Sequence, residues 1–155
     1  MADVHSPDIR SKNMRAIRSK NTKPEILVRR ALHAAGFRYR LHVPGMPGKP
    51  DIVFSKFHAA ILIHGCFWHG HDCKFFKLPS TRTEFWRAKI EKNRINDARA
   101  FETLVSSGWR VAVVWECEIC RRPNEDQLSL TLRLSDWLKS ARTSIEIPPA
   151  HVSSQ

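Results

Sequence analysis

The pattern of apolar and polar positions predicts that the first half of the chain forms one helix and three short strands. Thr22-Lys23-Pro24-Glu25 is a capping box with proline in the first turn, so a helix is expected to begin there and to end at Gly36. Apolar and basic positions alternate from 37 to 43, which predicts a half-buried strand. The nearly continuous apolar segments 51–54 and 59–63 are typical of strands covered on both faces.

The second half opens with an irregular segment, residues 64–80, which is dense in histidine, cysteine and aromatic residues. Thr81-Arg82-Thr83-Glu84 is a second capping box, and a long helix is expected to follow it to about residue 106. Residues 109–115 alternate as a final strand, and the leucines of 125–141 predict an amphipathic helix. This order of elements is typical of an α/β domain in which helices flank a mixed sheet.

The length of 155 residues corresponds to about one domain. We expect a mobile basic arm at 1–21, a single domain at 22–141 and a flexible tail at 142–155. No apolar run approaches the roughly 18 residues of a membrane span, and the N-terminus lacks the apolar segment of an export signal. These features predict a cytoplasmic protein without membrane contact, whose cysteines stay reduced.

The charge balance predicts a polyanionic partner. There are 26 Lys and Arg against 15 Asp and Glu, a formal net charge of +11. The excess lies in two segments, residues 1–40 with a net charge of +7 and residues 74–99 with +5. Two separated basic segments predict two surfaces that hold one polyanion, such as duplex DNA, whereas general solubility would not require this clustering.

Residues 64–73 hold three histidines and two cysteines, a density that favours a metal site over free thiols and surface imidazoles. Three ligands come from this loop, and a cysteine just after the last strand completes a tetrahedral set suited to structural zinc. This set is Cys66, His71, Cys73 and Cys117. Cys120 forms a ligand pair with Cys117, so a four-cysteine set in which Cys120 replaces His71 remains an alternative.

Carboxylates are scarce in the predicted strands, which makes Asp51, at the head of one of them, a candidate Mg²⁺ ligand for phosphodiester cleavage. The following strand ends at Ile63-His64 without a second acid. A main-chain carbonyl would therefore have to supply the missing oxygen. His64 and His69 are candidates for proton transfer and for stabilising the phosphate.

Each candidate also has a purely structural explanation. Asp51 could cap a turn, and Glu25 is accounted for by its capping box. Asp97 follows Asn93 by four positions on the long predicted helix, where it could face solvent or orient a histidine. Their occurrence together beside basic segments favours a nuclease over these separate explanations.

Aromatic pairs lie among the lysines and arginines of the second basic segment, namely Phe67-Trp68, Phe75-Phe76 and Phe85-Trp86. Core packing is the usual role of such side chains. A metal-bound loop has little core to join, however, so these rings are candidates for stacking on bases or for insertion between base steps. Insertion would also test how easily a step unstacks, and a mismatch unstacks more easily.

Five motifs in fixed order resemble the very-short-patch-repair (Vsr) mismatch endonucleases, over roughly residues 3–140. They are Asn13-Met14-Arg15-Ala16-Ile17, Gly48-Lys49-Pro50-Asp51, His64-Gly65-Cys66-Phe67-Trp68-His69, Thr81-Arg82-Thr83-Glu84-Phe85-Trp86 and Trp115-Glu116-Cys117. The resemblance implies a restriction-endonuclease-like fold of the PD-(D/E)xK type. It also implies a strand-specific, Mg²⁺-dependent nick 5′ to the T of a T:G mismatch, the product of 5-methylcytosine deamination.

The resemblance also implies roles for individual residues. Asp51 and the main-chain carbonyl of Ile63 would bind Mg²⁺, and His69 would be the general base, supported by Asp97, with His64 and Glu25 around the site. It favours His71 over Cys120 as the fourth zinc ligand. The intercalating residues would be Phe67, Trp68, Trp86 and, from the N-terminal arm, Met14. DNA backbone contacts are expected from Lys12, Arg15, Arg82 and Lys89.

The expected partner is double-stranded DNA with a T:G mismatch, and the resemblance adds mismatch-repair proteins as further partners. A monomer is expected because a nick in one strand needs one active site. Two alternatives remain from the sequence, a zinc-stabilised DNA-binding module without catalysis and a restriction-type nuclease of the same fold.

Overall fold

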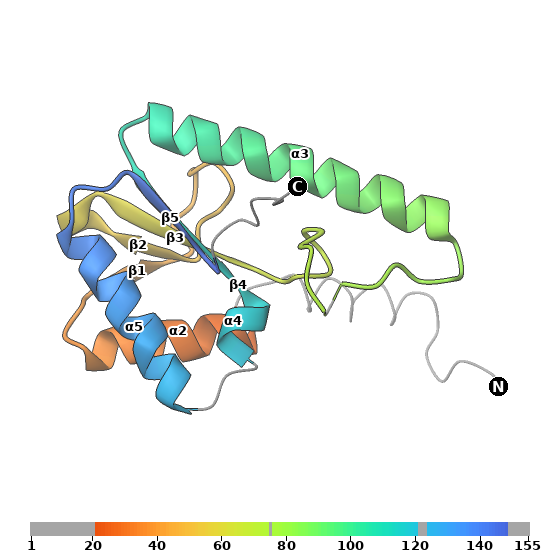
Figure 1. Ribbon diagram of the computed structural model, residues 1–155. Coiled ribbons are helices and arrows are strands. Elements are labelled where there is room, and N and C mark those ends of the chain that lie inside the picture. Colours follow the sequence, from red (N-terminus) through yellow and green to blue (C-terminus); the bar gives the residue numbers. More distant parts are fainter. Residues whose placement is uncertain (1–20, 75, 121–123, 149–155) are drawn as a thin grey trace, which may run out of the picture.

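The computed structural model describes residues 21–74, 76–120 and 124–148, which build a five-stranded sheet flanked by helices (Figure 1). The strands are β1 (Arg40–Leu41), β2 (Ile52–Phe54), β3 (Ala59–His64), β4 (Arg110–Trp115) and β5 (Ser144–Ile147), and they lie side by side in this order. β1, β2 and β3 are antiparallel, whereas β3, β4 and β5 are parallel. The mixed α/β architecture expected from the sequence is confirmed.

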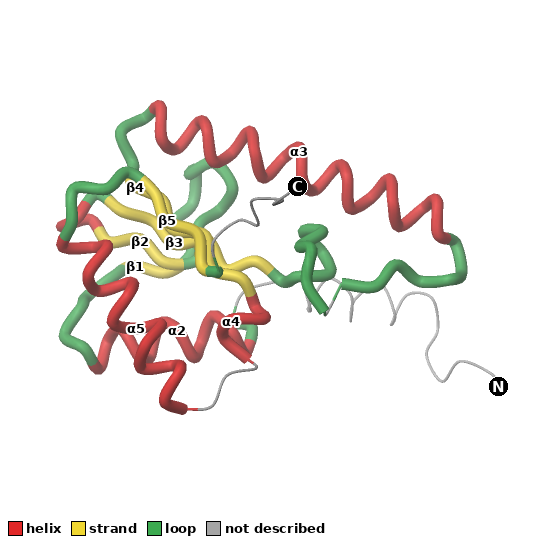
Figure 2. The backbone as a smooth tube through the Cα atoms, in the orientation of Figure 1, coloured by secondary structure: helices red, strands yellow, loops and turns green. Residues whose placement is uncertain are grey.

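Helices cover both faces of this sheet (Figure 2). α2 (Lys23–Ala34), α4 (Glu116–Cys120) and α5 (Asn124–Lys139) lie on one face, and α3 (Thr83–Ser106) crosses the other. The larger core lies between the sheet and the α2–α5 side and includes Phe54 and Trp137, whose side chains are fully buried. A smaller core around Leu62, Leu104 and Val111 lies under α3. β2 is buried throughout and β3 nearly so, as their apolar sequences predict.

α2 forms where the capping box predicts it. The Thr22 side chain accepts a hydrogen bond from the Glu25 amide at 3.5 Å, and proline occupies the first turn. The helix ends before Gly36, whose φ of 99° is a left-handed conformation that glycine adopts at little cost. Glu25, in this first turn, has a buried side chain.

The strand expected at 37–43 is much shorter, because β1 contains only two residues. His42 has a φ of 49°, a left-handed conformation that ends the extended segment, and Leu41 is exposed. Phe37 instead joins the core, and the Tyr39 hydroxyl donates to the main-chain oxygen of Arg29 at 2.7 Å.

The flexible tail expected from residue 142 is wrong for residues 144–147, which form β5. This strand pairs in parallel with β4 and brings the fully buried Ile147 into the core. The Trp115 indole also donates to Glu146 at 2.8 Å. The alternation Ser144-Ile145-Glu146-Ile147 is the signal of this strand, but it is too short to distinguish from a tail ahead of two prolines.

α3 ends where the sequence predicts, but it does not begin with the predicted capping box. The residue before it, Arg82, is left-handed with a φ of 55° and makes no side-chain cap. The Thr83 hydroxyl instead donates back to the main-chain oxygen of Pro79 at 2.9 Å. α3 buries only Ile90 and Leu104, and its first half extends beyond the sheet beside the loop that follows β3 (Figure 1).

The N-terminal arm and the end of the tail lie outside the described residues. The arm contains Lys12, Met14 and Arg15, whose expected DNA contacts are therefore not described. Among the residues that are described, no helix combines the length and the apolar character of a membrane span.

Candidate active site and metal centre

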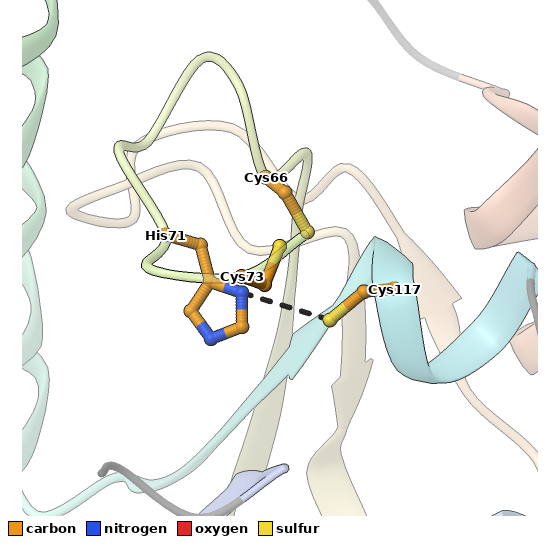
Figure 3. A group of neighbouring side chains, drawn as sticks. All are labelled: Cys66, His71, Cys73 and Cys117. Atoms are coloured by element: carbon orange, nitrogen blue, oxygen red, sulfur yellow. Dashed lines mark hydrogen bonds between the residues drawn. The ribbon is translucent and has the colours of Figure 1, made fainter. Parts of the chain in front are cut away.

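The Cys/His group lies where the loop after β3 meets the first turn of α4 (Figure 3). The ligand atoms of Cys66, His71, Cys73 and Cys117 lie within 4.8 Å of one another, and the Cys117 sulfur is 3.6 Å from His71 Nδ1. The loop turns back on itself through a hydrogen bond from the His71 amide to the main-chain oxygen of Cys66, at 2.9 Å. Cys120 is exposed and does not belong to this group, so the geometry favours the set that contains His71.

The chemistry of these donors fits a thiophilic metal ion. Burial raises the pKa of the Cys66 and Cys117 thiols, because charged sulfur is poorly solvated there. Thiols crowded together in this way ionise when a cation neutralises them. The His71 ring also stacks on Trp115 at 4.1 Å, which fixes the imidazole beside the sulfurs.

Asp51 lies at the start of β2 and is tied to the end of β3. Its amide donates to the main-chain oxygen of Ile61 at 3.0 Å, and its Oδ2 accepts a hydrogen bond from the Ile63 amide at 2.7 Å. The carboxyl group is therefore held beside Ile63, whose main-chain carbonyl is the second predicted ligand of the metal.

A second carboxyl group faces Asp51 from α2. Glu25 has only 1% of its surface exposed; its Oε2 accepts from Arg29 at 2.5 Å, and its Oε1 lies 2.7 Å from His42 Nε2. The donor atoms of Glu25, His42 and Asp51 lie within 4.8 Å of one another. His42 and Arg29 are absent from the sequence-based site. His42 has only a basic position in an alternating segment as its signal, and Arg29 has only its i+4 spacing from Glu25.

The environment of Asp51 raises its pKa to about 7. Burial is the main cause, and the charge and hydrogen bonding of the neighbouring Glu25 carboxyl raise it further. The Ile63 amide and His42 act in the opposite direction but do not cancel these effects. The Asp51 carboxyl group is therefore still partly protonated at neutral pH, and a bound cation would displace this proton.

Two histidines and an aspartate meet directly after this strand end. The His69 ring stacks on His64, with 4.0 Å between the ring centres. His69 Nδ1 lies 2.5 Å from Asp97 Oδ2, and Asn93, one turn earlier on α3, donates its amide to the main-chain oxygen of Trp68 at 2.8 Å. The i, i+4 pair on α3 thus contacts the loop, and Asp97 does not simply face solvent. A carboxylate at Nδ1 selects the tautomer in which Nε2 accepts protons.

His64 is buried at the end of β3 and lies edge-on to Trp115. Burial lowers its pKa to about 3, with a smaller effect from His69, while Asp97 acts in the opposite direction. His64 is therefore a neutral imidazole at physiological pH. Its Nδ1 has no hydrogen-bond partner among the described residues.

The aromatic side chains form a cluster outside both cores. The Phe67 ring lies 5.1 Å from Trp68 and 5.5 Å from Trp86, and the two tryptophans are 5.8 Å apart. All three are half-buried, and the neighbouring Phe85 is exposed under the Arg82 guanidinium, which lies 4.2 Å from its ring. The predicted intercalating rings on the loop and α3 are therefore adjacent, and Met14 lies outside the described residues.

Sequence comparison relates this chain to known proteins. The family model described as DNA mismatch endonuclease Vsr matches residues 2–75. The chain is 44% identical over 147 residues to DNA mismatch endonuclease Vsr of Escherichia coli (strain K12), which covers 95% of this chain and 94% of that protein. It is 50% identical over 119 residues to the type II nicking enzyme V.XorIIP of Xanthomonas oryzae pv. oryzae, covering 77% and 88% of the two chains. The chain therefore belongs to the Vsr family of DNA mismatch endonucleases.

Proposed function

We propose that this DNA mismatch endonuclease cuts one strand of duplex DNA 5′ to the T of a T:G mismatch, in a Mg²⁺-dependent reaction that initiates very short patch repair of deaminated 5-methylcytosine. The observation that carries the proposal is that two sets of groups meet the end of β3. Asp51 bonds the Ile63 amide, and the next residue, His64, stacks on the His69 ring that Asp97 holds. The names of relatives as mismatch endonuclease and nicking enzymes support it.

Each group at this strand end has a chemical task. The Asp51 carboxylate and the main-chain carbonyl of Ile63 would hold Mg²⁺, which when bound polarises the phosphate and acidifies water. His69 would accept the proton of the attacking water through Nε2, while Asp97 holds the ring in that tautomer. The neutral His64 would contact the phosphate, and Glu25 would support Asp51 from its hydrogen-bonded position on α2.

Recognition of the mismatch would depend on the aromatic cluster and the basic segments. Phe67, Trp68 and Trp86 would enter the weakened step, and Met14 would enter it from the minor groove. Lys12, Arg15, Arg82 and Lys89 would contact phosphates. The Cys/His centre would hold Zn²⁺ and so fix the loop that carries both His69 and the inserting rings.

Three further features complete the proposal. The mixed sheet with its acidic strand end supports a restriction-endonuclease-like fold of the PD-(D/E)xK type. We propose that the protein acts as a monomer in the cytoplasm, since one active site suffices for a nick. Mismatch-repair proteins are the proposed protein partners.

A cleavage assay tests this function. Full-length protein is incubated with a T:G duplex and with the matched T:A duplex, each with and without Mg²⁺. We expect cleavage of one strand in the T:G duplex when Mg²⁺ is present, and little or none in the other three reactions. Equal cleavage of matched and mismatched DNA, or a double-strand break, would instead support a restriction-type nuclease.

Replacing Asp97 with asparagine should slow nicking by about 10²- to 10⁴-fold, because the amide no longer fixes the tautomer of His69 or stabilises its protonated form. Single-turnover kinetics measure this rate, and binding of the T:G duplex should change little. Glu91→Gln removes a carboxylate from an exposed position of the same helix and is the matched control. Equal rates for Asp97→Asn and the control would show that the pair has no role in proton transfer.

The apparent affinity for Mg²⁺ should depend on pH through Asp51. Its pKa of about 7 lies above the ordinary value, so the proton is favoured below pH 7 and leaves as the pH rises through 7. Calorimetry should show binding that strengthens by about tenfold per pH unit below 7 and levels off above it. Asp51→Asn removes both the titrating group and the proposed ligand, so it should bind Mg²⁺ too weakly for calorimetry at every pH. A pH-independent affinity in the unaltered protein would contradict the assignment.

A further inference from the structure

His42 lies at the acidic site without a role in the function described above. Its Nε2 is 2.7 Å from Glu25 Oε1, and the donor atoms of Glu25, His42 and Asp51 lie within 4.8 Å of one another. These residues come from three separate segments, α2, the turn after β1 and the start of β2. The chain folds an imidazole against two carboxyl groups, an arrangement that no pattern in the sequence indicates.

The main chain holds His42 in this place. Its amide donates to the main-chain oxygen of Asp51 at 3.2 Å, so the histidine is tied to the residue whose carboxyl group it approaches. Its left-handed conformation, with a φ of 49°, ends β1 and turns the chain at this point. Only 16% of the His42 side chain is exposed, and the ring lies against the acidic pair instead of extending into solvent.

The hydrogen bonding of Glu25 leaves one oxygen on the side of the imidazole. Its Oε2 accepts from Arg29 at 2.5 Å, whereas Oε1 lies 2.7 Å from His42 Nε2 and also accepts a longer hydrogen bond from the Asn21 amide at 3.3 Å. An Asp51 carboxylate oxygen lies within 4.8 Å of the donor atoms of Glu25 and His42, so the three side chains converge on one point. The result is a donor set of two carboxylate oxygens and one imidazole nitrogen.

A donor set of two carboxylate oxygens and one imidazole nitrogen differs from the all-oxygen set that Mg²⁺ prefers. Mg²⁺ prefers oxygen ligands in regular octahedral geometry. Imidazole nitrogen binds first-row transition-metal ions more strongly than it binds Mg²⁺. Among these ions, Mn²⁺ also accepts carboxylate oxygen readily. A nitrogen donor beside the carboxylates therefore strengthens the binding of Mn²⁺ more than that of Mg²⁺.

We propose that His42 is a nitrogen ligand of the divalent cation held by Asp51, and that it shifts the preference of the catalytic site from Mg²⁺ towards Mn²⁺. The inference rests on the proposed function, since it takes the Asp51 site as the catalytic cation site. In the metal-bound protein, the neutral imidazole carries its proton on Nδ1 and directs the Nε2 lone pair to the cation.

The test compares Mn²⁺ and Mg²⁺ binding by calorimetry at pH 8 in the full-length protein and three variants. His42→Gln keeps a hydrogen-bond donor for Glu25 but removes the imidazole, and it should lower the Mn²⁺-to-Mg²⁺ affinity ratio about tenfold, mainly by weakening Mn²⁺ binding. His33→Gln, at an exposed position on the same helix as Glu25, is the matched control and should leave the ratio unchanged. Asp51→Asn tests whether Asp51 binds either cation.

A spectroscopic readout identifies the ligand directly. Pulsed electron paramagnetic resonance of bound Mn²⁺ should show coupling to a ¹⁴N nucleus, and His42→Gln should remove that coupling. If both the ratio and the coupling are unchanged in His42→Gln, the inference is overturned and His42 only donates a hydrogen bond to Glu25. If Asp51→Asn also binds both cations normally, Asp51 is not a cation ligand and the proposed function fails. If Asp51→Asn loses both cations while His42→Gln behaves like the unaltered protein, the proposed function stands and only the role of His42 is overturned.

Discussion

Replacing Asp51 with asparagine should lower the rate of T:G nicking by about 10³-fold or more. A cation that neutralises the phosphate supplies several kcal/mol of transition-state stabilisation, and each 1.4 kcal/mol corresponds to about a tenfold change in rate. Asparagine has the shape of aspartate and retains an oxygen to accept the hydrogen bond from the Ile63 amide. The variant therefore removes the negative charge while keeping the connection between β2 and β3.

The stability of the Asp51→Asn variant separates lost chemistry from misfolding. Because the pKa of Asp51 is raised to about 7, the neutral carboxyl group is favoured in the fold, and ionisation above pH 7 costs stability. The metal-free variant should therefore unfold at the same temperature as the unaltered protein or higher at pH 8. Asp136→Asn, at an exposed position on α5, is the charge-matched control for nicking. Nicking by Asp51→Asn within tenfold of this control would refute the role of Asp51.

Replacing Cys117 with serine should release the metal from the Cys/His centre and destabilise the fold. Cys117 is the proposed ligand on α4, whereas the other three lie in the loop, so its loss should free the segment that carries His69 and the aromatic rings (Figure 3). We expect the free energy of unfolding to fall by at least about 3 kcal/mol, a fraction of the roughly 10–16 kcal/mol that zinc supplies to isolated finger peptides. Elemental analysis and thermal unfolding measure the two effects.

Nicking should fall with the metal content, because the Cys/His centre and the proposed catalytic histidines contact the same tryptophan. Trp115 stacks on His71 and lies edge-on to both His64 and His69. Cys120→Ser alters an exposed cysteine three residues later and is the matched control, which should keep one zinc per chain and full stability. A metal-free Cys120→Ser protein, or a Cys117→Ser protein that keeps its zinc, would show that the ligand set is wrong.

The elements with strong local signals were predictable from the sequence. α2 has both a proline-containing cap and a terminal glycine, and the continuous apolar segment of β3 indicates a strand buried on both faces. β5 escaped prediction because four residues carry too little periodicity, and its formation depends on pairing with β4, which is distant in sequence. The second capping box failed because α3 begins at Thr83 with Arg82 as its N-cap residue, so Thr81 lies one position too early to cap the helix.

The site shows the same division between local and tertiary information. The spacing of Cys66, His71 and Cys73 within one loop is a local signal, and the position of Asp97 four residues after Asn93 placed it correctly on one face of α3. Sequence alone could not choose between His71 and Cys120, because that choice depends on where α4 directs its side chains. It also missed His42, which reaches Glu25 only through a left-handed turn and the packing of α2 against the sheet.

The position of the cut tests the central claim of T:G-directed nicking most directly. A T:G duplex is labelled in turn at the 5′ end of each strand, incubated with full-length protein and Mg²⁺, and the products are resolved to single nucleotides. We predict a single cut immediately 5′ to the mismatched T, an intact G strand, and no product from the T:A duplex. Cuts in both strands, or a cut whose position does not follow the T when the mismatch is moved, would contradict the account.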